Sequence, residues 1–428
     1  MSQTPMSPTL IELKPLAPAH GGTCIAHTKE GKPVFVAHTA AGETVRAVIH
    51  TQRSKVAYAD AVEVLDPHPA RRAHIWPQAG PGGVGGAELG HLEESFQRQW
   101  KEQVIYDQLR RVGGKELYQH VQAQLGTGGA RVRAASGDEG EVALHRRLRI
   151  ECEVSARGRL AMRPAHGREL IDIEDMPLAD ESLLQLQVWG DTPWSKKWKP
   201  GQRVRLLAPQ KGQARIVVGK KVYDPDGKEV APFVTWQVQH AGQQVGLTVH
   251  AQGFWQSHRS AANDLVETVM RLSRLQPGDS VLELYAGAGL LSFFMAEQIG
   301  PTGRLLTVEG AAQAVADARS NLASLGTGVR IWRGNVDACT VKRAGRQFGG
   351  SPTAVVLDPP RAGAGREVIA AIAELKAQRV VLVSCDPAAG ARDCAALLES
   401  GYALGGIEAI DLFPQTHHVE IVSVWELP

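Results

Sequence analysis

A cysteine at position 385 stands where a thiol could act as a nucleophile. It follows a continuous apolar run, 380–383, that predicts a strand buried on both faces, and it precedes an alanine-rich helical pattern over 388–400. Backbone N–H groups near a helix N-terminus stabilise negative charge, so this position favours the thiolate over the thiol. The commoner alternative is a small buried residue in a strand. The residues that follow the neighbouring strands favour the nucleophile.

Polar and turn-forming residues also follow the other predicted strands in this part of the chain. They are, in order, the loop 285–289, Glu309, Asn335 and the loop 358–361. In a doubly wound sheet the carboxyl ends of the parallel strands form one rim, and ligands bind outside it. We therefore expect these residues to lie around the same pocket as Cys385.

The glycines of loop 285–289 indicate which cofactor this pocket takes. Ser292 occupies the place of the third glycine, so the dinucleotide-binding fingerprint is incomplete. Glu309 can accept hydrogen bonds from both hydroxyls of an adenosine ribose. This combination favours S-adenosylmethionine over a nicotinamide cofactor. A purely structural acid at Glu309 and a helix N-cap at Asp358 are the alternatives.

The elements that position these residues begin at residue 261. From there helical and strand patterns alternate to residue 425, which indicates βαβ units and a doubly wound α/β sheet. The expected strands lie at 280–284, 304–308, 329–332, 353–357, 380–383 and 421–425.

The first part of the chain has a different character. Between residues 10 and 65, short β-like runs separated by glycines are typical of a small barrel. Such a barrel could bind RNA, and the equal alternative is that its surface only contacts solvent. Residues 67–90 indicate a linker, and 131–250 alternate strand-like runs and turns. Within the latter, Trp194 to Lys199 interleaves indole rings with lysines, which suits phosphate contacts and base stacking unless the tryptophans pack on their own domain.

Composition excludes few classes of binding partner, but it indicates the cellular compartment. The 428 residues carry a formal net charge of +2, too small to indicate nucleic acid by itself. No apolar stretch reaches the roughly 18 residues of a membrane span, and residues 1–18 lack a signal-peptide pattern. The five cysteines fit neither a disulfide framework nor a metal site. We expect a cytoplasmic protein with no resident metal.

Six motifs resemble those of the RNA 5-methyluridine methyltransferases in order and spacing. They are Phe254-Trp255-Gln256, Glu283 to Gly289, Glu309-Gly310, Asp358 to Gly363, Val383 to Pro387 and Thr416 to Glu420. The N-terminal barrel is similar to the family's TRAM domain, an OB-like fold that binds RNA. The resemblance implies three parts: a TRAM-like β-barrel at 8–66, a linker with a mixed α+β central domain at 67–255, and a Rossmann-like class I S-adenosylmethionine-dependent methyltransferase domain at 256–428.

The resemblance also implies a role for each candidate residue. Cys385 would add to carbon 6 of a uracil and Glu420 would take the carbon 5 proton, although such a glutamate is more often a surface residue on an edge strand. Phe254 would stack on the target base, which has to leave its stack, and Arg361 would border it. The implied partner is tRNA or rRNA, bound by a monomer. The S-adenosylmethionine site would be formed by Gln256, Tyr285, Glu309, Asn335 and Asp358.

The chain departs from the family pattern in three places. Leu290 stands where the family usually has Asn, and Ser257-His258 stands where it has a small residue and Asn. Many members hold an iron–sulfur cluster through four cysteines. Because clusters need thiolates, we expect none here, where those positions fall at or near Ala79, Val84, Ala87 and Met176. A methyltransferase for cytosine or another RNA atom, and a catalytically silent RNA-binding relative, are the alternative functions.

Overall fold

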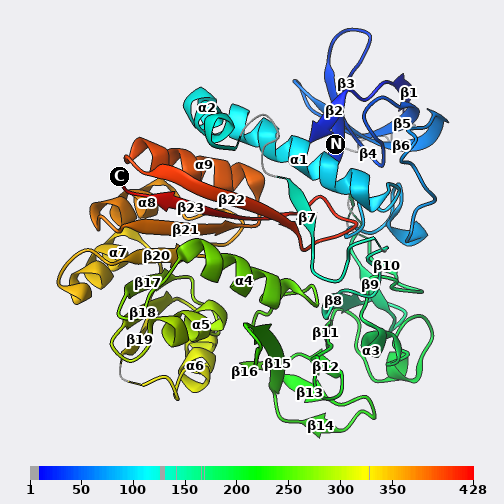
Figure 1. The fold of residues 1–428 in the computed structure, drawn as a ribbon. Helices are drawn as coiled ribbons and strands as arrows, with labels where there is room; N and C mark the ends of the chain where they lie inside the picture. Colours follow the sequence, from blue (N-terminus) through cyan, green and yellow to red (C-terminus); the bar gives the residue numbers. More distant parts are fainter. Residues whose placement is uncertain (1–8, 126–130, 141, 165, 168, 327) are drawn as a thin grey trace, which may run out of the picture.

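The computed structural model describes residues 9–125, 131–140, 142–164, 166, 167, 169–326 and 328–428. These residues form four β-sheets, with helices packed around the largest one (Figure 1). Pro8, the first residue of the predicted barrel, lies outside them. Within these ranges we find no helix with the length and apolar character that crossing a membrane requires.

The largest sheet has eight strands in the order β19-β18-β17-β20-β21-β23-β22-β7. Its first five run parallel, and they are the strands expected from the sequence. Every residue of β20 is buried, which is why its sequence shows no polar alternation. The predicted doubly wound sheet is confirmed by β17 (Ser280–Leu284), β18 (Arg304–Glu309), β19 (Val329–Arg333), β20 (Ala354–Leu357) and β21 (Arg379–Ser384).

Helices cover both faces of this sheet (Figure 1). The chain leaves β17 for β18 on one side and returns to β20 on the other, so a topological switch point, where ligands bind, lies between β17 and β20. One face is covered by α4 (Ala261–Ser273), α5 (Leu290–Ile299) and α6 (Ala312–Asn321). The other is covered by α7 (Ala338–Gly345), α8 (Arg366–Glu374) and α9 (Pro387–Glu399), with α1 (Glu94–Arg111) and α2 (Gly114–Leu125) beside α9 and a short η3 (Arg346–Phe348) after α7.

Three further strands extend the sheet beyond β21. β23 (Glu420–Glu426) runs antiparallel between β21 and β22 (Ala403–Asp411), and β7 (Val132–Ala134) pairs with β22. Glu420 therefore begins an interior strand and is only 4% exposed. The alternative of a surface glutamate on an edge strand is wrong, because β23 is hydrogen-bonded on both sides.

The N-terminal strands form a six-stranded sheet in the order β1-β5-β6-β4-β3-β2 (Figure 1). The predicted barrel is corrected in one respect: among the described residues this sheet is not closed, since β1 and β2 stand at its two ends. β2 pairs with β3 over three residues, which leaves few backbone groups for a closing ladder. The strands are β1 (Thr9–Leu13), β2 (Ala17–Ala19), β3 (Thr23–His27), β4 (Pro33–Ala37), β5 (Thr44–Gln52) and β6 (Ala57–Asp66).

The central segment contains an antiparallel sheet and a hairpin. In the short helix η2 (Pro193–Lys196) and the turn after it, Trp194 and Trp198 are 8% and 6% exposed, and their rings stack at 5.9 Å. They pack on their own domain, so they do not offer the base-stacking surface that their spacing indicated. The sheet consists of β8 (Arg149–Val154), β9 (Leu160–Met162), β10 (Ile171–Asp172), β11 (Arg203–Leu207), β12 (Arg215–Val218), β13 (Lys221–Tyr223) and β14 (Glu229–Val230); the hairpin is β15 (Phe233–His240) with β16 (Gln243–His250), and η1 (Pro77–Ala79) and α3 (Glu181–Leu184) complete the segment.

Candidate active site

A cavity of about 890 Å³ opens at the carboxyl ends of β17, β18, β20 and β21. This volume lies in the range of cofactor and small-molecule sites. Asn335 is the one predicted site residue outside its lining, and it lies beside Gly310, where an added Cβ would come 3.4 Å from the Asn335 Oδ1. The predicted residues that line the cavity are Phe254, Gln256, Tyr285, Glu309, Asp358, Arg361, Cys385 and Glu420.

Cys385 lies between β21 and α9, where its sequence position predicted it. Burial, and then the charges of Glu420 and Asp358, raise the pKa of the Cys385 thiol to about 12 against the lowering effect of Arg361. The prediction that this position favours the thiolate is therefore wrong. Burial and two carboxylates outweigh the nearby helix N-terminus, whose cap is completed by Asp386 accepting the Ala389 N–H at 2.8 Å.

Two carboxyl groups of the cavity, those of Glu420 and Asp358, hold protons more readily than exposed ones. Burial, together with the charge of Asp358, raises the pKa of Glu420 well above its usual range, and burial raises the pKa of Asp358 to about 6. Asp358 does not cap the following helix, because the N-cap of α8 is Gly365. That alternative is wrong, and Asp358 is left facing the cavity.

Glu283 is a cavity residue to which the sequence reasoning assigned no role. It lies within β17, lines the cavity and is 2% exposed. Burial raises the pKa of Glu283 to about 8, although Ser292 donates a hydrogen bond to its carboxylate. A charged residue inside an otherwise buried strand was the available signal.

Glu309 joins the cofactor side of the cavity to the glycine loop. Its carboxylate accepts the Gly287 N–H at 3.0 Å and the Ala311 N–H at 2.7 Å. Tyr285, at the start of the loop, has a φ of +62°, a left-handed conformation that is uncommon for residues other than glycine. Glu309 is thus both a structural acid and a cavity residue, and Leu290, the departure from the family pattern, also lines the cavity.

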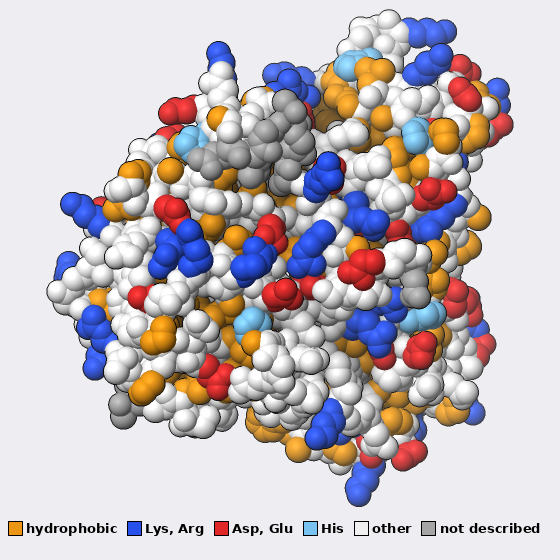
Figure 2. Space-filling model, in the orientation of Figure 1, with side chains coloured by type: hydrophobic (Ala, Val, Ile, Leu, Met, Phe, Trp, Pro, Cys, Tyr) orange, Lys and Arg blue, Asp and Glu red, His pale blue; other side chains and the backbone are white. Residues whose placement is uncertain are grey.

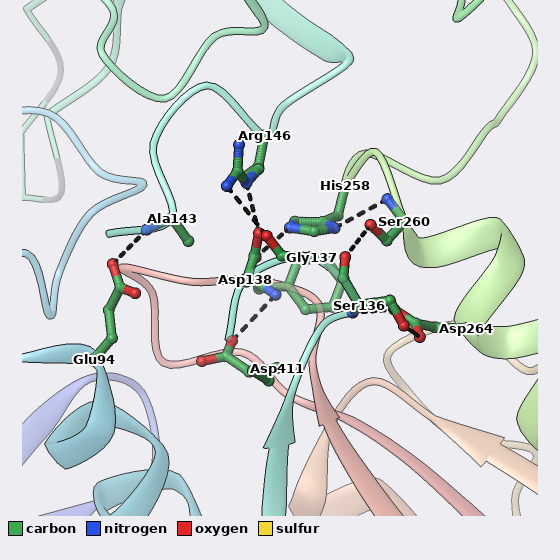
Figure 3. A network of polar contacts seen from close by, with 12 residues as sticks. Glu94, Ser136, Gly137, Asp138, Ala143, Arg146, His258, Ser260, Asp264 and Asp411 are labelled. Atoms are coloured by element: carbon green, nitrogen blue, oxygen red, sulfur yellow. Dashed lines mark hydrogen bonds and ion pairs between the residues drawn. The ribbon is translucent and has the colours of Figure 1, made fainter. Parts of the chain in front are cut away.

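A polar network fixes His258, which directly follows the wall segment 254–257 (Figure 3). Asp138 accepts hydrogen bonds from Arg146 Nε at 2.5 Å and pairs with His258 Nε2 at 2.9 Å. Ser260 donates to the Ser136 carbonyl at 2.6 Å, and the Ser136 hydroxyl donates to Asp264 at 2.5 Å. His258, which replaces the usual Asn, therefore ties the wall to the loop that precedes β8.

A smaller cavity of about 310 Å³ adjoins the first and is rich in arginine. Arg361 and His418 line both cavities, and the Arg361 Nη2 lies 3.3 Å from the His418 Nε2. Burial lowers the pKa of His418 to about 3, so its ring is neutral. At the mouth, Phe254 is 67% exposed and the Arg149 guanidinium lies 5.6 Å from its ring centre. The other arginines of the smaller cavity are Arg146, Arg147 and Arg149.

Comparison with known proteins gives the chain a family. The model of the tRNA (uracil-5-)-methyltransferase family matches residues 229–426, and that of the TRAM domain matches residues 10–62. A protein of Streptomyces coelicolor described as an uncharacterized RNA methyltransferase is 35% identical over 439 residues, which cover 97% of this chain and 92% of the relative. The chain belongs to this family of RNA uracil-5-methyltransferases. The predicted enzyme class, an S-adenosylmethionine-dependent RNA methyltransferase, is confirmed.

Two further members of the uracil-5-methyltransferase group extend the comparison. The 23S rRNA (uracil(1939)-C(5))-methyltransferase RlmD of Halomonas elongata is 28% identical over 451 residues, covering 96% of this chain and 88% of its own. The crystal structure of Pyrococcus abyssi tRNA (uracil-54, C5)-methyltransferase in complex with S-adenosyl-L-homocysteine superposes with a TM-score of 0.65 and 18% identity, covering 96% of this chain and 99% of that one. This second likeness establishes the shared fold.

The cavity fits the methyl donor of the uracil-5-methyltransferases, whereas the linker does not fit an iron–sulfur cluster. The donor's adenosine would find the Glu309 carboxylate and the backbone of loop 285–289 on the cavity wall. The four positions where a cluster was considered are buried in one apolar core and carry no thiol. These are Ala79, Val84, Ala87 and Met176, each at most 2% exposed.

Proposed function

We propose that this enzyme methylates carbon 5 of a uridine in tRNA or rRNA, with Cys385 as the nucleophile and Glu420 as the general base. The observation that carries the proposal is the placement of both groups in one buried cavity. They come from paired antiparallel strands, since Ser384 of β21 lies opposite Ile421 of β23. Glu420 is close enough to Cys385 for its charge to raise the pKa of the thiol.

The chemistry needs both groups because carbon 5 of uracil is a weak nucleophile. The Cys385 thiol gives its proton to solvent, and its sulfur forms a bond to carbon 6. The electron pair of the carbon 5–carbon 6 double bond moves into an enolate, and carbon 5 can then take a methyl group. Glu420 next removes the carbon 5 proton, and the electron pair of that C–H bond restores the ring double bond as the sulfur leaves. S-Adenosylmethionine, when bound, supplies the methyl group and a positive charge on its sulfonium.

The high pKa of the Cys385 thiol explains why the site needs positive charge during the reaction. Arg361 already lowers this pKa, and a cation in the same cavity acts in the same direction. Because its pKa is raised, the buried Glu420 carboxylate is a stronger base than an exposed carboxylate. Burial thus weakens the nucleophile in the resting protein and strengthens the base.

The RNA would enter from the side of Phe254 and the smaller cavity. An exposed aromatic ring under a guanidinium is suited to stacking with an unstacked base, and neighbouring arginines are suited to phosphate. Charges of both signs are mixed on the face drawn in Figure 2. Ion pairs such as Arg271 with Glu408 and Lys342 with Glu374 also balance charge on the protein. We therefore assign RNA contact to the cavity mouth rather than to a surface of one sign.

Formation of 5-methyluridine by the purified chain tests the proposal. The protein would be incubated with S-adenosylmethionine and unmodified transcripts of tRNA or of 23S rRNA, and nucleosides would be quantified by mass spectrometry after digestion. We expect 5-methyluridine in one of the two transcripts. Formation of 5-methylcytidine would favour the cytosine alternative, and RNA binding without any methylated nucleoside would favour a silent relative.

Glu309→Ala is expected to weaken the binding of S-adenosylmethionine by roughly 1.5–3 kcal/mol, the range for a hydrogen bond to a charged group. The substitution removes the hydrogen bonds between the carboxylate and the ribose. It also removes the hydrogen bond that the carboxylate accepts from the Gly287 N–H. Calorimetric titration measures the change. Glu297→Ala, at an exposed position of α5, is the matched control and should bind normally. Unchanged affinity in Glu309→Ala would remove Glu309 from the cofactor site.

A further inference from the structure

Three histidines converge where the N-terminal sheet meets the segment that leads into α1. His38 directly follows β4, whereas His74 and His91 lie between β6 and α1. One ring nitrogen from each lies within 4.8 Å of the others. The ring centres form a nearly equilateral triangle with sides of 6.1, 6.2 and 6.3 Å. Spacing along the chain did not predict this cluster, because His38 is separated from His74 and His91 by two strands, β5 and β6.

The cluster is buried, and half of its ring nitrogens lack partners. His91 is 3% exposed, and neither of its nitrogens makes a hydrogen bond within the described ranges of the chain; the backbone of Thr39 lies near the ring without completing one. His38 is 8% exposed, and its Nδ1 likewise has no partner there. Buried polar atoms of native proteins are nearly always paired, so unpartnered nitrogens aimed at one another indicate a missing ligand.

Both ring nitrogens of His74 have partners, so a ligand would have to displace one of them. Its Nε2 lies 3.1 Å from the Ala87 carbonyl, the kind of contact that orients a metal-binding imidazole. Its Nδ1 accepts the Trp76 N–H at 3.1 Å, a bond that coordination through Nδ1 would displace.

The backbone is shaped to hold the rings this close. His38 has a φ of +59°, a left-handed backbone conformation that residues other than glycine rarely adopt. Gly90 leaves room for the His74 ring, because an added Cβ would come within 2.8 Å of its Cε1. Arg71 donates to the His38 carbonyl at 2.9 Å, and its charge is offset by the buried Glu43 carboxylate at 2.5 Å. The three rings thus lie beside an ion pair and not beside an unpaired charge.

We propose that His38, His74 and His91 bind one divalent transition-metal ion of the zinc class. Three imidazoles suit Zn²⁺, which takes nitrogen ligands at about 2.0–2.1 Å and leaves a fourth position for water. The ion joins the end of β4 to the segment before α1. That segment contacts the loop preceding Glu420, since the Leu89 N–H donates to the Gln415 carbonyl at 2.9 Å. The ion therefore fixes the N-terminal sheet relative to the catalytic cavity.

Metal titration of the full-length chain tests the proposal. Protein stripped with a chelator would be titrated with Zn²⁺ by calorimetry, and with Co²⁺ by visible absorption, which reports the coordination of the ion directly. We expect one ion per chain. The matched variants are His91→Asn and His38→Asn, with His27→Gln, an exposed histidine of β3, as the control. Loss of a ligand should exceed the roughly 10–100-fold weakening typical of residues that only orient ligands.

The wild-type titration decides the question even if a variant fails to fold, which circular dichroism would reveal. Stripped wild-type protein that takes up neither ion at one equivalent would show that the histidines are only a packed cluster. Uptake that persists unchanged in folded His91→Asn would place the ion elsewhere. Either result overturns the assignment.

Discussion

Cys385→Ala is expected to abolish methyl transfer, by a factor on the order of 10⁴ or more, as removal of a covalent nucleophile does elsewhere. Without the sulfur, no bond to carbon 6 can form and carbon 5 stays unreactive. Radiolabelled RNA should then show no covalent complex on a denaturing gel. RNA containing 5-fluorouridine, from which the base cannot remove a proton, should be trapped by the wild-type enzyme and not by the variant.

The matched control is Cys394→Ala, which removes a buried thiol from α9 that lies 3.8 Å from the Ser423 hydroxyl and outside the cavity lining. It should keep both activity and the fluorouridine complex. Calorimetry should show that Cys385→Ala still binds S-adenosylmethionine, which separates lost chemistry from lost folding. A Cys385→Ala enzyme that still methylates RNA would mean that another group activates the uracil.

The parallel core of the catalytic sheet could be predicted because its strands are buried on both faces. Ala354 to Leu357 and Val380 to Val383 form unbroken apolar runs, each followed by a turn that carries polar residues. Parallel strands bring those turns to one rim. Local sequence was therefore enough to collect most of the cavity lining without any knowledge of long-range contacts.

The remaining features depend on contacts between distant segments. The interior position of Glu420 follows from β22 adding to the far side of β23, which no local pattern encodes. The charge state of Cys385 depends on Asp358 and Glu420, which come from two other strands. Trp194 and Trp198 have the spacing of an RNA-binding loop, yet they face the core of their own domain. In each case the residue type indicated a possible role, but the sequence did not show which residues would surround it in the fold.

Glu420→Gln is expected to stop the reaction after methyl transfer, with methylated RNA still attached to Cys385. The amide has the shape of a protonated carboxyl, which is the form that the raised pKa of Glu420 favours, so the cavity should keep its structure. The amide carries no negative charge beside the Cys385 thiol, so addition to carbon 6 is not impaired. The carbon 5 proton has no acceptor, and elimination stalls.

Denaturing gels with RNA labelled through the transferred methyl group distinguish this outcome from simple inactivity. Glu420→Gln should accumulate a labelled protein–RNA complex with ordinary uridine, whereas the wild type should do so only with 5-fluorouridine. Glu420→Asp keeps a carboxylate on a shorter side chain and should release product slowly. Because addition and release use different residues, only the base variant should trap a methylated product that contains ordinary uridine. Normal turnover by Glu420→Gln without a trapped complex would assign proton removal to another cavity acid, such as the partly buried Asp358 or the buried Glu283.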